Sequence, residues 1–195
     1  MRHEFKSRWG YVFIRCLKGV CPLFPNLGFP QQRVIESKYF TLEFPRECEL
    51  VEFAQKINVN YFLQMDIPSS DTKNFDSIIS KTLDALYLEV SDILDIHIYS
   101  YHGKIKVYPN KEKLKENVFR NYPGQKYNLP SVYIHSDNAI HISLADLTLG
   151  MLAHEIAHAI ISHYFVVPPP AKVQEVLAGY VEYSIRKSAG TLPSR

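Results

Sequence analysis

Apolar residues recur along the chain with two different periods, which separate the expected strands from the expected helices. A spacing of three and four residues places side chains on one face of a helix, and it runs through residues 49–64, 75–94 and 171–190. Residues 33–44 are instead rich in β-branched and aromatic side chains, alternate in part and stop at Pro45. That pattern is typical of a β-strand.

Turn-forming residues separate further short apolar stretches. We expect two β-hairpins, one from residues 96–100 and 104–108 around His102-Gly103, and one from residues 131–135 and 139–143 around residues 136–138. In the first, Gly103 would supply a positive φ angle. A short charged helix over residues 111–119 is expected between the two hairpins.

The helix expected over residues 144–163 is apolar nearly all the way round, which indicates that it is buried. Ser143 and Asp146 fit an N-cap followed by an acid in the first turn. Three prolines, residues 168–170, then break the chain. Pro170 suits the first position of the last helix.

The expected order of elements is β, α, α, ββ, α, ββ, α, α, which indicates an α+β domain with one mixed sheet backed by helices. We expect this domain over residues 33–190. Residues 1–32 are expected to be an N-terminal extension or a degraded export signal, because Arg15 and Lys18 interrupt their apolar run. The protein is periplasmic or secreted if they are an export signal, and cytoplasmic otherwise.

Composition narrows the class of protein. A length of 195 residues suits one domain that needs neither a metal nor a disulfide to fold. A net charge of +2 argues against a nucleic-acid partner, and no segment is long and apolar enough to span a membrane. We expect a monomer. Cys16, Cys21 and Cys48 match neither a C-x-x-C pair nor an even disulfide framework, so we assign them no chemistry.

The buried helix carries the pattern His154-Glu155-Ile156-Ala157-His158. Two imidazoles four residues apart project from one face of a helix, which is the spacing that two ligands of one metal ion need. Glu155 lies close enough to act as general base on a water bound to that metal. H-E-x-x-H on a helix is the signature of zinc peptidases, so we expect one Zn²⁺ per chain and a peptide or protein substrate.

A catalytic zinc site needs a third protein ligand. His163 lies about 180° round the helix from His154, so it faces away. Glu175 is the better candidate, because the proline loop lets the last helix return antiparallel beside the first. Glu182 lies about 20° from Glu175 on the helix and is either a substitute ligand or an acceptor for a ligand's N–H.

With His154, Glu155, His158 and Glu175 in this order, the chain resembles the gluzincin group of zinc metallopeptidases, the thermolysin and aminopeptidase N kinship, in a small version. The resemblance implies a zincin-like fold in which a mixed sheet precedes the active-site helix and a backing helix lies behind it. Residues 75–94 would be that backing helix. Residues 139–143 or their hairpin partner would be the edge strand that binds the substrate backbone.

The chain also departs from the gluzincin pattern. Gly179 stands where thermolysin-like enzymes have an aspartate, and the Gly-x-Met-Glu-Asn motif of aminopeptidase N relatives is absent. Tyr164, Tyr180 and Tyr183 are candidate oxyanion donors. His135 and His141 are expected to be strand residues rather than ligands.

Two alternatives to a peptidase therefore stay open. One is a weakly active or inactive zinc-binding module with a regulatory or binding role, and the other is a hydrolase of non-peptide amides.

Overall fold

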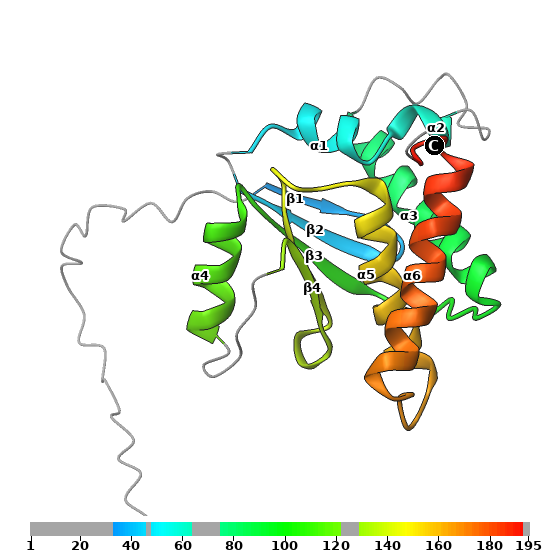
Figure 1. Cartoon of the computed structure of the whole chain (residues 1–195). Coiled ribbons are helices and arrows are strands. Elements are labelled where there is room, and N and C mark those ends of the chain that lie inside the picture. Colours follow the sequence, from blue (N-terminus) through cyan, green and yellow to red (C-terminus); the bar gives the residue numbers. More distant parts are fainter. Residues whose placement is uncertain (1–32, 46–47, 64–74, 122–128, 193–195) are drawn as a thin grey trace, which may run out of the picture.

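The protein is a mixed α/β structure, a five-stranded mixed sheet with six α-helices in the described residues (Figure 1). The computed structural model describes residues 33–45, 48–63, 75–121 and 129–192. The expectations for residues 1–32, including Cys16 and Cys21, lie outside this range. No helix in the described ranges has the length and apolar character to cross a membrane.

The strands follow the spatial order β1-β2-β3-β5-β4. β2, β3 and β5 are parallel, while the edge strands β1 and β4 are antiparallel to their neighbours. The strands are β1 (Arg33–Glu36), β2 (Phe40–Phe44), β3 (Gly103–Tyr108), β4 (Ser131–Ile134) and β5 (Ala139–Ser143).

One row of side chains crosses all five strands, because Ile35, Leu42, Ile105, Ile140 and Tyr133 are paired in register. Side chains alternate between the two faces of a sheet, so this row defines one face. The helices are α1 (Leu50–Lys56), α2 (Val59–Leu63), α3 (Phe75–Leu94), α4 (Lys111–Asn121), α5 (Leu149–Tyr164) and α6 (Ala171–Ser188). Most of them lie on the side of that face, and α4 covers the other face (Figure 1).

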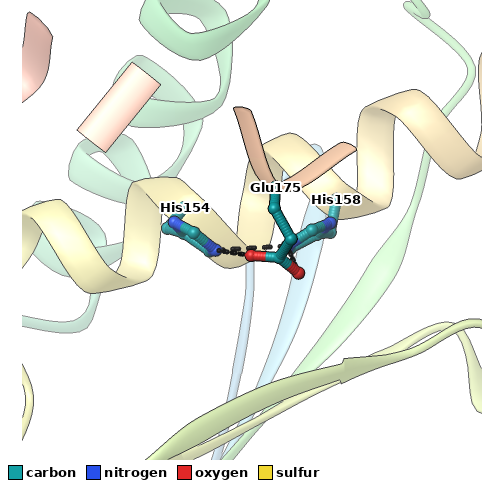
Figure 2. A group of neighbouring side chains, drawn as sticks. All are labelled: His154, His158 and Glu175. Carbon is teal, nitrogen blue, oxygen red and sulfur yellow. Dashed lines mark hydrogen bonds and ion pairs between the residues drawn. The ribbon is translucent and has the colours of Figure 1, made fainter. Parts of the chain in front are cut away.

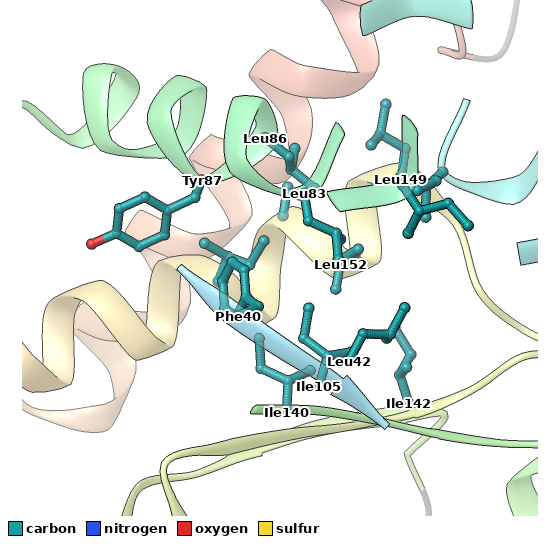
Figure 3. Close-up of a cluster of buried hydrophobic side chains, with 14 of the residues drawn as sticks. Phe40, Leu42, Leu83, Leu86, Tyr87, Ile105, Ile140, Ile142, Leu149 and Leu152 are labelled. Carbon is teal, nitrogen blue, oxygen red and sulfur yellow. The ribbon is translucent and has the colours of Figure 1, made fainter. Parts of the chain in front are cut away.

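The main core lies between that sheet face and the helices α3 and α5 (Figure 3). The side chains that meet there are fully or almost fully buried: Phe40, Leu42, Ile105, Ile140 and Ile142 from the sheet, and Leu83, Leu86, Tyr87, Leu149 and Leu152 from the helices. α5 therefore packs against the sheet, against α3 and against α6.

Two predictions about strands are wrong. Residues 33–44 form the antiparallel hairpin β1–β2 rather than one strand, because the chain turns at residues 37–39. Residues 96–100 form no strand. Gly103, expected in a turn, is the first residue of β3 and does not have a positive φ angle. The hairpin at residues 131–143 is confirmed as β4–β5.

The expected helices over 75–94, 111–119 and 171–190 are confirmed as α3, α4 and α6 within a few residues. The helix expected over 49–64 is divided into α1 and α2 by Asn58, which has φ 51°. α5 begins at Leu149 rather than at residue 144, and its N-cap is Thr148, not Ser143. Ser143 ends β5, and its hydroxyl donates to Asp146 instead.

Candidate metal centre

The candidate site lies where α5 and α6 pack side by side (Figure 1). The Thr148 hydroxyl accepts from the backbone N–H of Met151 and fixes the start of α5. The proline loop at residues 165–170 then reverses the chain, and the buried Ala178 lets α6 approach α5 closely. Side chains from the two helices can therefore meet over one face of α5.

Three potential metal ligands converge there: His154 and His158 from α5 and Glu175 from α6 (Figure 2). The two Nε2 atoms are 3.1 Å apart. One carboxylate oxygen of Glu175 lies 3.5 Å from Nε2 of His154, and the other lies 3.4 Å from Nε2 of His158. Within the described residues this is the one group of three or more such side chains that could hold an ion.

These spacings fit a zinc ion. Zinc bound at about 2.0–2.1 Å in tetrahedral geometry separates its ligand atoms by roughly 3.3 Å. The contacts of 3.1, 3.4 and 3.5 Å are close to that separation. The Glu175 side chain is 63% exposed, so the group opens to solvent on the side of α6. Two imidazoles and one carboxylate are also the ligand set of many catalytic zinc sites.

Burial favours the neutral form of the His158 imidazole, which is the form that can bind a metal. Desolvation, and then the neighbouring His154, lower the pKa of His158 below its ordinary value. A neutral imidazole has a lone pair to offer, whereas a protonated one has none. His158 is therefore suited to bind a cation at neutral pH.

Glu182 lies on the other side of His154. Its Oε2 is 3.4 Å from Nδ1 of His154, and its Oε1 is 3.4 Å from the guanidinium of Arg186. Nδ1 makes no aligned hydrogen bond within the described part of the chain, and the Glu182 carboxylate lies beside it. A carboxylate at Nδ1 favours the proton there and leaves Nε2 free for a metal. Of the two roles predicted for Glu182, this position suits the acceptor rather than the substitute ligand.

Glu155 is buried between α5 and the edge strand β4. The Ser131 hydroxyl donates to Oε1 of Glu155 at 2.6 Å, and the nearby backbone of Tyr133 favours the charged form of the carboxylate and so opposes a rise in its pKa. Burial raises the pKa of the Glu155 carboxyl, against the opposing effects of the Ser131 hydrogen bond and of His154. The carboxylate is thus held in place from the sheet.

A cavity of about 620 Å³ connects the candidate metal ligands with Glu155. His154, Glu155, His158 and Glu175 all line it, and β4 supplies its opposite wall from Ser131 to Tyr133. A reacting group in this cavity would contact the candidate ligands and the candidate base together.

Several predicted site residues lie elsewhere. Tyr180 and Tyr183 are exposed on α6 and do not line this cavity, and neither does Tyr164. The structure therefore does not bring these candidate oxyanion donors to the site. As expected, His163 lies outside the ligand group. Its Nδ1 shares a hydrogen bond with the Ala159 carbonyl.

Two further histidines are also separate from the ligand group. His135 lies in the turn after β4, at the edge of the cavity. His141 is buried on β5 and shares a 2.9 Å hydrogen bond with Tyr108.

Three residues that shape the site were not predicted from the sequence: Ser131, Arg186 and Gly150. A Cβ on Gly150 would lie 2.7 Å from Cγ of Arg186 and 3.1 Å from Cγ of Glu182. Gly150 thus makes room for the side chains beside His154. The position of Gly150 in the first turn of the motif helix could have indicated this role. Nothing in the sequence near Ser131 indicates its contact with Glu155.

Comparison of the chain with protein-family models, with curated proteins and with solved structures finds no match.

Proposed function

We propose that the protein is a zinc-dependent metallopeptidase of gluzincin type, with His154, His158 and Glu175 as the metal ligands and Glu155 as general base. The observation that carries the proposal is the convergence of three ligand atoms at zinc-like spacing beside a buried carboxylate in the same cavity. A peptide or protein is the proposed substrate, and a monomer is the proposed unit.

The arrangement of elements supports a zincin-like fold. β4 is an antiparallel edge strand that faces the cavity, as expected of the strand that binds a substrate backbone, and it is the hairpin partner of residues 139–143. α3 packs behind α5 in the core, as expected of a backing helix. α6 follows α5 and carries Glu175.

Zinc, when bound, supplies a Lewis acid that polarises a carbonyl and makes water more acidic. His154, His158 and Glu175 would hold the metal, and Glu182 would orient His154. Glu155 takes a proton from the attacking water and later donates it to the leaving amine. Its raised pKa suits both steps, because such a carboxyl is a stronger base than an exposed one and can retain the proton for transfer.

The test combines metal analysis with cleavage of a peptide library by the wild type and by Glu155→Gln. We expect one zinc per chain in both proteins and cleavage by the wild type alone, because Glu155 is no ligand. His158→Ala should lose the zinc and the cleavage together. Zinc without cleavage in either protein would leave a zinc-binding module, and a chain that binds no zinc would contradict the whole proposal.

A further inference from the structure

Exposed apolar side chains are concentrated on one part of the surface. Eight of the fourteen large exposed apolar residues in the described ranges lie between residues 164 and 183. We call these eight the apolar flank: Tyr164, Phe165, Val166, Val167, Val173, Val176, Tyr180 and Tyr183. Scattered exposed apolar residues are ordinary, but eight of them on one loop and the helix that follows it favour an interaction surface.

The flank has two parts, a loop and a helix face. The loop projects beyond the adjoining ends of α5 and α6 (Figure 1), and in it Val166 is 100% exposed and Val167 80%. On α6, Val173, Val176, Tyr180 and Tyr183 follow a spacing of three, four and three residues, which places them on one face. The core residues of α6, such as Ala178 and Val181, lie on the opposite side.

The acidic and basic residues of α6 lie on different parts of the helix. Both carboxylates of the helix, Glu175 and Glu182, contact His154 on α5. The loop at residues 165–170 carries no charge, and the exposed Lys172 and Lys187 stand near the two ends of the helix face. The flank is therefore an apolar surface bordered by cations and free of its own carboxylates.

This charge pattern favours an anionic bilayer surface over a second copy of the chain. In an antiparallel pair of α6 helices, Lys172 of one copy would face Lys187 of the other, and like charges at such positions repel. A bilayer instead accepts valines at the acyl boundary, tyrosines at the headgroup level and lysines at the phosphates. Each class of side chain in the flank has a place in that arrangement.

We propose that the apolar flank is a peripheral docking surface for membranes that contain anionic phospholipids. The Val166-Val167 loop would enter the interface first, with the outer face of α6 lying along it. Gln174 and Glu175, which line the cavity, lie on the same helix as the flank, so docking would hold the cavity close to the membrane surface. The surface contains no candidate metal ligand, and its use does not depend on the proposed peptidase activity.

The test is co-sedimentation of the full chain with vesicles of phosphatidylcholine alone and of phosphatidylcholine with one-fifth phosphatidylserine. We expect the wild type to bind the anionic vesicles, and 0.5 M salt to weaken the binding at least threefold. The double variant Val166→Asp/Val167→Asp should bind at least tenfold more weakly. Val34→Asp/Val51→Asp is the matched control, since it places the same charges on apolar residues about half exposed outside the flank.

Circular dichroism would establish that each variant is folded, and Glu155→Gln should bind vesicles as the wild type does. The proposal is overturned if the wild type binds neither vesicle, if it binds both equally, or if the control variant is released as readily as the flank variant. A dimer in sedimentation equilibrium that Val166→Asp/Val167→Asp dissociates would assign the flank to a second copy instead. Failure of peptide cleavage with vesicle binding intact would contradict the proposed function alone.

Discussion

At the scale of single residues, the hydrogen bond from Ser131 to Glu155 connects the sheet to the proposed chemistry. Ser131 and Tyr133 are two residues apart on β4, so their side chains share the sheet face that α5 covers. The hydroxyl of Ser131 reaches Oε1 of Glu155 at 2.6 Å. A carboxylate held by a buried donor keeps one orientation, which is what a general base needs.

We predict that Ser131→Ala lowers kcat roughly tenfold and leaves KM almost unchanged, since groups that orient a catalytic or metal-binding side chain contribute on the order of 10–100-fold. The loss of a buried donor should also cost about 1–3 kcal/mol of stability. Steady-state kinetics on a cleaved peptide and thermal unfolding measure the two effects. Ser131→Thr keeps the hydroxyl and is expected to restore most of kcat. A wild-type kcat in Ser131→Ala would contradict the positioning role.

His141 makes stability depend on pH. Burial, reinforced by Lys106, lowers its pKa from 6.5 to about 4. Its Nε2 has no hydrogen-bond partner within the described part of the chain. Between these two values the unfolded chain binds a proton that the folded chain does not, so acid favours the unfolded state.

The free energy of unfolding should therefore fall by about 2–3 kcal/mol as the pH drops from roughly 7 to roughly 4, at 1.36 kcal/mol per pH unit. Urea unfolding of the metal-free wild type and of His141→Gln across this range measures the contribution. Glutamine stays neutral and can accept from the Tyr108 hydroxyl, so the variant should lose stability less steeply. Equal slopes in the two proteins would show that His141 does not titrate in this way.

At the scale of secondary-structure elements, two glycines offer opposite outcomes for the same substitution. Gly150 on α5 faces Arg186 and Glu182, with no space for a Cβ, whereas a Cβ on Gly179 of α6 would have no atom within 4 Å. Alanine in a helix interior is more favourable than glycine by about 0.5–1 kcal/mol. Forcing a methyl group into a packed interface costs about 1–3 kcal/mol.

We predict that Gly179→Ala raises Tm by about 2 °C and that Gly150→Ala lowers it, since 1 kcal/mol corresponds to roughly 2–4 °C in a chain of this size. Gly150→Ala should also weaken zinc binding, because it displaces Glu182 from Nδ1 of His154. Differential scanning fluorimetry and zinc titration measure the two effects. A Gly150→Ala protein as stable as Gly179→Ala would show that the α5–α6 contact is loose.

The elements that could be predicted from sequence are those specified by neighbouring residues. The 3.6-residue period of apolar residues predicted α3 and α6, and the polar residues between two short apolar stretches predicted the β4–β5 hairpin. The β1–β2 turn could not be predicted, because it is stabilised from a distance: Asp84 of α3 accepts from the backbone N–H groups of Lys38 and Tyr39. Gly103 has a steric role rather than the turn role that was predicted, since a Cβ there would overlap the Tyr101 hydroxyl.

The same distinction holds in the candidate site. The i, i+4 spacing alone places His154 and His158 together, and a short loop suffices to bring Glu175 opposite them. Ser131 contacts Glu155 across 24 residues of sequence, so only the fold reveals it. Tyr180 and Tyr183 follow Glu175 on the same helix, but they lie on its exposed face and do not line the cavity.

At the scale of the whole molecule, the proposed metal would add a link between α5 and α6 to an apolar core that already includes both helices. The core of buried apolar side chains includes Ala178, Val181 and Ile185 of α6, whereas the Glu175 side chain is 63% exposed. A ligand that binds only the folded state stabilises it by about 2.7 kcal/mol at one hundred times its Kd. Zinc should therefore raise Tm without being required for folding.

We predict that excess zinc raises Tm by roughly 5–10 °C over the chelated protein, given about 2–4 °C per kcal/mol at this chain length. The chelated protein should keep its circular dichroism spectrum at 25 °C. His158→Ala should show no zinc-dependent shift, whereas His163→Ala, which removes a histidine of α5 outside the ligand group, should respond as the wild type does. A chain that unfolds on chelation would mean that the fold requires the metal. A zinc response in His158→Ala equal to that of the wild type would mean that the ion binds elsewhere.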